Sequence, residues 1–153
     1  MKTEVFFNKT FSAWFFVLIA VLLVVPGCSD GRPQRVPVSG TVTIDGKPVP
    51  YGSIRVWPAG QRMATGKIDK EGHFTLSCYG GNDGIMPGTH TVSVTAIENV
   101  NARTVRWHAP KKYMDPKTSD LKVKIDGPTD NLEVKLTWGG QKGPFTEATT
   151  AAE

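Results

Sequence analysis

A period of two governs the apolar residues of this chain from residue 36 to residue 136. Apolar and polar side chains alternate in short segments, and no window after Cys28 shows the 3.6-residue period of a helix. Such alternation places one face of a strand on a core and the other in water, as in antiparallel sheets. The side chains expected inside are Val42, Ile44, Val56, Phe74, Leu76, Val94, Val123 and Val134.

Turn-forming sequences separate the alternating segments. Asp45-Gly46 follows the first segment, DKEG stands at 69–72, and DGPTD at 126–130 links the last two segments. Glycine adopts positive φ without a steric penalty, and Asp tolerates it, so these sequences favour tight turns. We therefore expect an all-β fold, a single antiparallel β-sandwich of about seven strands over residues 36–138.

The N-terminus carries the features of an export signal. Lys2 and Lys9 precede a 15-residue apolar run at 11–25 (FSAWFFVLIAVLLVV), and Gly27 stands before Cys28. A run of this length rises only about 22 Å as a helix, short of the roughly 30 Å hydrocarbon core of a bilayer. The pattern favours a cleaved signal peptide at 1–27 over an uncleaved membrane helix.

Cys28 lies at the position of a lipid-modified cysteine. Val25-Pro26-Gly27-Cys28 resembles the bacterial lipobox, although Pro26 departs from the usual small residue. The resemblance implies acylation of Cys28, membrane lipid as a partner, and an exported protein anchored to a bacterial envelope membrane. Residues 28–35 are polar and contain Gly and Pro, and are expected to form a tether. Residues 139–153 contain little to bury and are expected to form a flexible tail.

The second cysteine, Cys78, has no disulfide partner if Cys28 is acylated. It shares the parity of Phe74 and Leu76, and free cysteine is among the most buried residue types. A catalytic thiol would need a nearby histidine and an electropositive cleft. We therefore expect Cys78 to be a core residue.

Common catalytic and metal-binding motifs are absent from the sequence. It contains no phosphate-binding loop and no Gly-x-Ser-x-Gly elbow, and its three histidines lack metal-ligand spacing. Turn geometry accounts for Asp45, Asp69, Asp83 and Asp126. We expect no catalytic residue, metal or cofactor. The formal net charge of +4 is too small to indicate a nucleic-acid partner.

Several short stretches in order resemble the carboxypeptidase regulatory-like domain, and more closely the small bacterial lipoproteins that carry one such domain. The stretches are 40–49 (GTVTIDGKPV), 65–66, 72–76 (GHFTL), 87–89 (PGT), Pro110 with Tyr113, Asp115-Pro116, and Ser119 with Leu121. The resemblance covers about residues 36–138 and implies a transthyretin-like sandwich that ends in a hairpin. Because the regulatory-like domain accompanies a catalytic domain without hydrolysing anything itself, the resemblance implies a non-enzymatic role.

The connection at 97–119 is too long for an ordinary hairpin loop, and long loops on rigid scaffolds often bind ligands. Its candidate ligand-binding residues are Arg103, Arg106, Trp107, Lys111, Lys112 and Tyr113. The basic side chains would attract an anion, and the aromatic rings would stack on a sugar. Alternatively, Trp107 and Tyr113 cap the sandwich while the basic residues stay in solvent, an interpretation we favour because the family pattern includes the tyrosine.

Two functions remain open. The first is a lipid-anchored cell-envelope protein, structural or interacting with other envelope proteins. The second is a module that captures an anionic or carbohydrate partner, such as an envelope polysaccharide, through residues 97–119. We expect no nucleic-acid partner for an exported domain.

Overall fold

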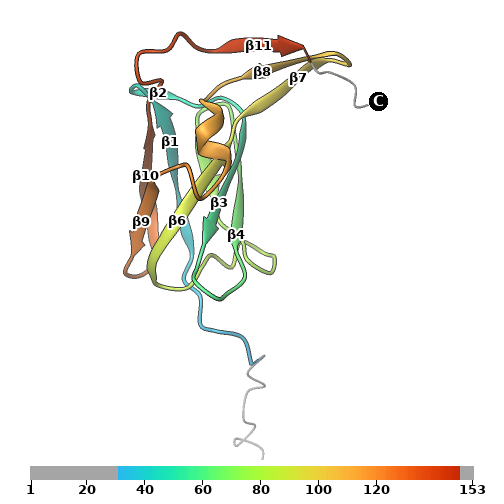
Figure 1. The fold of residues 1–153 in the computed structure, drawn as a ribbon. Coiled ribbons are helices and arrows are strands. Elements are labelled where there is room, and N and C mark those ends of the chain that lie inside the picture. The colour runs from blue at the N-terminus through green and yellow to red at the C-terminus, as the bar shows by residue number, and fades with distance from the viewer. Residues whose placement is uncertain (1–30, 149–153) are drawn as a thin grey trace, which may run out of the picture. The chain divides into compact units, whose positions relative to one another are not determined.

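The structure is a computed structural model, and it describes residues 31–148. Its elements are β strands apart from one short 3-10 helix (Figure 1). In chain order they are β1 (Val38–Ile44), β2 (Lys47–Pro48), β3 (Gly52–Trp57), β4 (Ala64–Ile68), β5 (His73–Thr75), β6 (Gly88–Thr95), β7 (Ile97–Asn101), β8 (Thr104–Trp107), η1 (Lys111–Met114), β9 (Leu121–Ile125), β10 (Thr129–Leu136) and β11 (Phe145–Ala148). The all-β prediction is confirmed, with more strands than the alternation predicted.

Two packed sheets form a β-sandwich. One has the order β10-β1-β2, with β5 also paired to β1, and the other has the order β4-β3-β6-β9. The core lies between them, and all eight side chains that the alternation placed inside are buried, none more than 9% exposed. Burial alternates along β1 and β4, as a strand with one face on a core requires.

The turn between β1 and β2 follows from its two residues. Asp45 and Gly46 both have positive φ, 47° and 79°. A two-residue hairpin turn with positive φ at both positions matches the twist of the flanking strands. Thr43 pairs with Pro48 across it in antiparallel register.

The strands of the two sheets pair in antiparallel register, as expected, except that β1 and β10 pair in parallel register. Val42 lies opposite Val134, and Ile44 lies opposite Leu136. Because β9 pairs with β6 and β10 with β1, the turn at 126–128 joins the two sheets and does not close the final hairpin that the resemblance implied. Period-two alternation specifies which face of a strand is buried but not the direction of its neighbour.

Gly40 allows β1 and β10 to approach each other at the point where their register shifts, between Val38 and Gly40. A Cβ atom on Gly40 would overlap the backbone carbonyl of Leu132. Glycine inside a strand commonly marks such a close approach between backbones.

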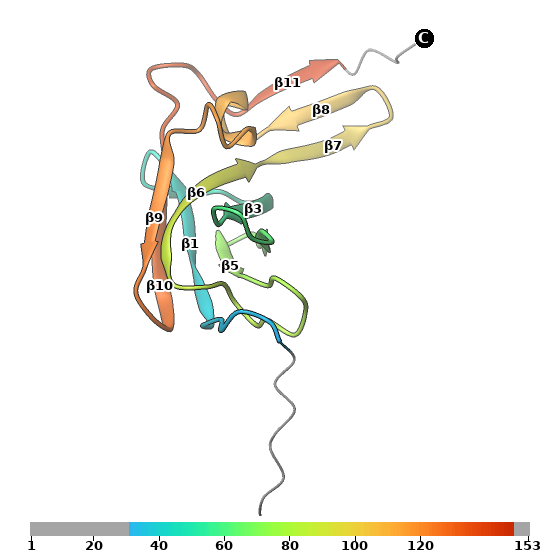
Figure 2. The same cartoon turned by 60° about the horizontal axis from the view of Figure 1, so that its bottom comes forward.

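A third sheet, which we call the wing, consists of β7, β8 and β11 in the order β11-β8-β7. The chain passes from β6 through Ala96 directly into β7, so the wing continues the sandwich outwards. The compact unit begins at Pro33, and Figures 1 and 2 show the chain entering it at the end opposite the wing. Pro33 to Arg35, expected to belong to the tether, are therefore part of this unit.

The wing overturns two expectations. The connection at 97–119 contains a β hairpin and a 3-10 turn, because β7 pairs with β8 in antiparallel register. The segment at 139–153 was expected to be a flexible tail, but its residues Phe145–Ala148 form β11 and pair with β8. Phe145 lies opposite Trp107, and this aromatic contact supplies the burial that the segment lacks on its own.

Cys78 and His90 take ordinary structural positions. Cys78 is a free thiol, partly buried and packed against the core, with its Sγ 3.4 Å from the carbonyl oxygen of Arg62. Burial raises the pKa of the Cys78 thiol, and the nearby Asp83 carboxylate raises it further. His90 is buried on β6, with Nε2 2.8 Å from the carbonyl oxygen of Met86.

Candidate functional site

Trp107 holds the last strand of the wing in place. Its indole ring stacks on Phe145 with the ring centroids 6.1 Å apart and the planes 14° from parallel. Its Nε1 donates a hydrogen bond of 3.0 Å to Glu147. Trp107 is only 8% exposed, although it lies outside the core of the sandwich. The ring is therefore committed to packing within the wing and has little free face to offer a ligand.

Lys111 also contacts the Trp107 ring. Its Nζ lies 4.9 Å from the centre of the indole ring and 2.6 Å from Glu147 Oε2. Hydrogen bonds from Lys111 and Trp107 lower the pKa of the Glu147 carboxyl. One carboxylate of β11 thus binds both a basic and an aromatic residue of the 97–119 segment.

Arg106 is paired within the β7–β8 hairpin. It lies opposite Glu98 in the antiparallel register, and its guanidinium is 3.5 Å from the Glu98 carboxylate. His108 Nε2 lies 2.8 Å from the same carboxylate. These two neighbours, His108 above all, lower the pKa of Glu98. Arg106 and Lys111 are both engaged by acids of the chain, so the segment is less basic than its sequence indicates.

The remaining three predicted residues lie apart. Tyr113 is buried in the core at 3% exposure, and Lys112 Nζ sits 4.8 Å above the centre of its ring. Arg103 is exposed near the tip of the β7–β8 hairpin, where its N–H donates to the side chain of Asn101. The structure therefore does not gather the six residues into one site, and it separates Arg103 and Arg106 from the lysines of η1.

A hollow lies between η1 and the segment that leads into β11. Its volume is about 430 Å³. The lining residues are Pro110, Lys111, Lys112, Trp138, Gly139, Gln141 and Phe145. Two of the predicted residues, Lys111 and Lys112, thus form one wall. The opposite wall contains Trp138, at the end of the predicted domain, and Gln141 and Phe145, which follow it.

Trp138 and its loop are held by packing that the sequence interpretation missed. Phe145 meets the Trp138 ring edge-on, with centroids 6.1 Å apart. Gly143 lies so close to the indole that a Cβ atom there would overlap the ring. The backbone N–H of Trp138 donates to the Asp45 carboxylate at 3.2 Å. Two aromatic residues flank GGQKGP in the sequence. Large aromatic side chains on both sides of the glycines indicate packing, because a flexible tail has no use for them.

A larger hollow, of about 560 Å³, surrounds the β9–β10 turn at the other end of the sandwich. Its lining contains no aromatic side chain, and its Lys124 pairs with Asp126 at 3.0 Å. Sugar and aromatic ligands are usually held by aromatic rings with a few polar groups around them. The hollow beside the wing is therefore the better candidate site.

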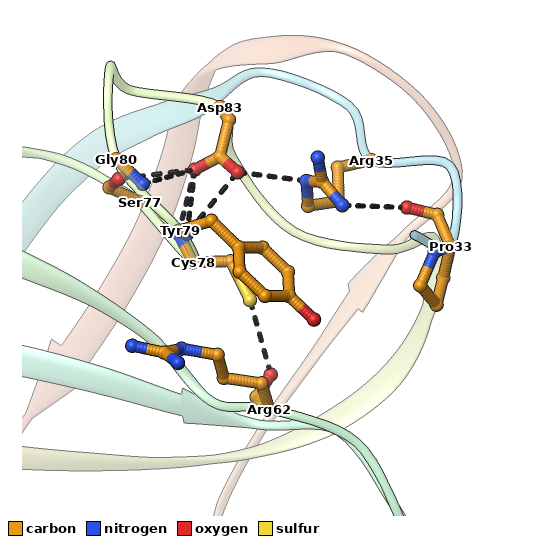
Figure 3. Close-up of polar contacts among 8 residues, drawn as sticks. All are labelled: Pro33, Arg35, Arg62, Ser77, Cys78, Tyr79, Gly80 and Asp83. Atoms are coloured by element: carbon orange, nitrogen blue, oxygen red, sulfur yellow. Dashed lines mark hydrogen bonds and ion pairs between the residues drawn. The ribbon is translucent and has the colours of Figure 1, made fainter. Parts of the chain in front are cut away.

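At the end of the sandwich where the chain enters, a cluster of hydrogen bonds surrounds one carboxylate, that of Asp83 (Figure 3). Asp83 accepts hydrogen bonds from the backbone N–H groups of Cys78, Tyr79 and Gly80 at 2.8–3.4 Å and from the Ser77 hydroxyl at 3.1 Å. Partial desolvation raises the pKa of this carboxyl, but the four donors outweigh it and lower the pKa to about 2. Asp83 organises the loop between β5 and β6 and is a structural residue.

Arg35 joins the entering chain to this cluster. Its Nε lies 2.8 Å from the Asp83 carboxylate, and its guanidinium donates to the carbonyl oxygen of Pro33 at 2.9 Å (Figure 3). Arg35 and Arg62 both lie over the ring of Tyr79, at 4.7 and 5.1 Å from its centre. The hollow among these residues is only about 10 Å³, so the contacts serve to attach the chain to the domain.

Residues 31–148 contain no group of three or more His, Cys, Asp and Glu side chains placed to hold a metal ion. Over the same residues, no helix has the length and apolar character needed to cross a bilayer. The expected signal peptide at 1–27 and the expected lipidation site Cys28 lie outside the described residues.

Comparisons of the chain with protein-family models, with curated proteins and with solved structures find no match.

Proposed function

We propose that the protein is a non-enzymatic, lipid-anchored component of a bacterial cell envelope whose domain, of the carboxypeptidase regulatory-like, transthyretin-like type, mediates interactions. The proposal draws on the export signal, the lipobox at Cys28 and the order of short motifs between residues 40 and 121. The all-β sandwich is compatible with the domain type.

The position of the wing is the observation that supports the proposed interaction role. The chain enters the compact unit at one end, and the wing extends from the opposite end (Figure 2). Because the compact unit begins at Pro33 and Arg35 is attached to Asp83, only residues 28–32 would separate an acylated Cys28 from the folded unit. Five fully extended residues span at most about 18 Å. A domain tethered this closely presents its far end, the wing, to other envelope components.

The charges of the wing support a role without catalysis. Glu98 is engaged by His108 and Arg106, and Glu147 by Lys111 and Trp107. Both acids have lowered pKa values, whereas a general acid that works near neutral pH needs a raised one. These groups are better suited to hold the wing together than to transfer protons.

Acyl labelling of the full chain in a bacterial host tests the anchoring. Cells that express the wild-type protein with labelled fatty acid should give a labelled protein in the membrane fraction. Cys28→Ala should lose the label and keep the signal peptide, because the acylated thiol is required for cleavage at a lipobox. Cys78→Ala is the matched control and should be labelled as the wild type. Equal labelling of the Cys28→Ala protein would refute the proposal.

A second candidate function, capture of an anionic or carbohydrate ligand, is favoured by the hollow beside the wing. Lys111 and Lys112, two residues of the 97–119 segment, line it together with Trp138 and Phe145. This function is compatible with the first, since a tethered domain can hold a ligand at its far end.

A further inference from the structure

We propose that the hollow beside the wing binds an acidic polysaccharide, specifically a chain of sugars that carry carboxylates, such as uronic acids. This inference rests on the proposed function in its ligand-binding form. It assigns the ligand to a site of seven residues, of which only Lys111 and Lys112 are among the candidate residues that the sequence singled out.

The aromatic wall of the hollow suits the apolar face of a sugar ring. Trp138 and Phe145 are partly exposed and meet edge to face. Gly143 packs against the Trp138 indole, and the backbone N–H of Trp138 donates to the Asp45 carboxylate, which fixes the chain beneath that side chain. Side chains held in this way lose little conformational entropy when a ligand binds, which favours affinity.

The basic wall selects for negative charge. The seven lining residues include two lysines and no acid. Lys112 makes no ion pair within residues 31–148, and its ammonium lies 4.8 Å from the centre of the Tyr113 ring. Lys111 is paired with Glu147, but an ammonium group has three donors and can serve a second carboxylate.

Gln141 supplies the remaining polar contact. Its side chain is exposed in the lining, and its backbone N–H donates to the Trp138 carbonyl at 3.1 Å, which fixes the turn of the loop. An amide side chain both donates and accepts hydrogen bonds, as recognition of sugar hydroxyls requires.

The combination of the two walls decides between ligand classes. A neutral sugar would leave the Lys112 ammonium without a carboxylate to pair with, and an acidic peptide would leave the aromatic wall without a sugar ring stacked on it. A carboxylate-bearing sugar uses both, because ring stacking and a charge-assisted hydrogen bond act on the same unit.

Affinity electrophoresis of the full-length protein, purified from membranes in non-ionic detergent, tests the proposal. The gels contain polygalacturonate, neutral dextran or poly-L-glutamate at matched mass and ionic strength. We expect retardation by polygalacturonate, at least roughly tenfold weaker retardation by dextran and by poly-L-glutamate, and loss of retardation in high salt.

Variants connect the binding to the hollow. Lys112→Gln should weaken binding roughly tenfold, which corresponds to the loss of one charge-assisted hydrogen bond. Lys122→Gln, on the exposed face of β9, makes the same change of charge away from the site and should bind as the wild type. Trp138→Leu should abolish binding. Gln141→Ala keeps the aromatic packing and should weaken binding, so it tests the site if Trp138→Leu does not fold.

Three results would overturn the proposal: no binding of polygalacturonate, equal binding of poly-L-glutamate, or equal weakening by Lys122→Gln. Equal binding of poly-L-glutamate would indicate an acidic protein partner or charge attraction alone. None of these results affects acyl labelling at Cys28, so failure of this inference is distinguishable from failure of the proposed function.

Discussion

The hydroxyl of Tyr113 donates a hydrogen bond of 3.2 Å to the carbonyl oxygen of Thr137 and accepts one of 3.1 Å from the N–H of the same residue. This paired contact ties η1 to the end of β10. It also sets the spacing of the candidate site, because Lys112 precedes Tyr113 on one wall and Trp138 follows Thr137 on the other. Tyr113 therefore acts from within the core on a hollow that it does not line.

Removal of the Tyr113 hydroxyl tests this link. Tyr113→Phe should lower the free energy of unfolding by about 1–2 kcal/mol, because both hydrogen bonds between the Tyr113 hydroxyl and the Thr137 backbone are lost. Denaturant unfolding measures the change. The exposed Tyr51 is the control, and Tyr51→Phe should be neutral. Equal effects of the two substitutions would show that the paired contact contributes nothing to stability.

Gly143 should be irreplaceable for a steric reason. In Gly143→Ala, the new methyl group would overlap the Trp138 ring, so the loop must move and Phe145 should lose its edge contact with Trp138. We expect a loss of about 1–3 kcal/mol, typical of overpacking. Gly127→Ala is the matched control, since no atom lies within 4 Å of a Cβ built there and its φ is not positive. Thermal unfolding that does not separate the two variants would contradict the packing described.

The Asp83 cluster should make stability depend on pH in acid. The pKa of Asp83 is lowered to about 2, so folding favours the ionised form. Its contribution is present above the ordinary carboxyl pKa of about 4 and is lost as the pH falls from about 4 towards 2. Asp83→Asn should be less stable by about 2 kcal/mol at pH 7, and the difference from the wild type should vanish near pH 2. A difference that stays constant from pH 7 to pH 2 would exclude an ionised Asp83 as its cause.

Truncation of Trp107 should loosen the wing and leave the sandwich folded. Trp107→Ala removes the stacking partner of Phe145 and the donor to Glu147. We expect hydrogen exchange to accelerate in β11, with a global cost of about 2–3 kcal/mol, below the ~3–5 kcal/mol typical of a large core aromatic. Trp57→Ala, at a 37% exposed tryptophan of β3, is the control and should leave β11 protected. Unchanged protection of β11 in the Trp107 variant would refute its role.

The site was only partly predictable from the sequence. Lys111 and Lys112 drew attention because basic residues stand beside Trp107 and Tyr113 in a long connection. Arg106 and Lys111 resembled free charges, since their partners Glu98 and Glu147 are brought near only by the pairing of β7, β8 and β11. The contribution of Trp138 and Phe145 was missed because a run of glycines between them resembles a tail.

The local pattern is predictable from the sequence: which side chains face inwards, and where Asp45-Gly46 turns the chain. Both follow from the residue and its immediate neighbours, through side-chain alternation and permitted φ angles. Only the folded structure shows that β10 runs parallel to β1 and that Phe145 of β11 lies opposite Trp107 of β8. These contacts join segments that lie far apart in the chain. Their stability depends on the apolar area that the two segments bury together, which cannot be read from either segment alone.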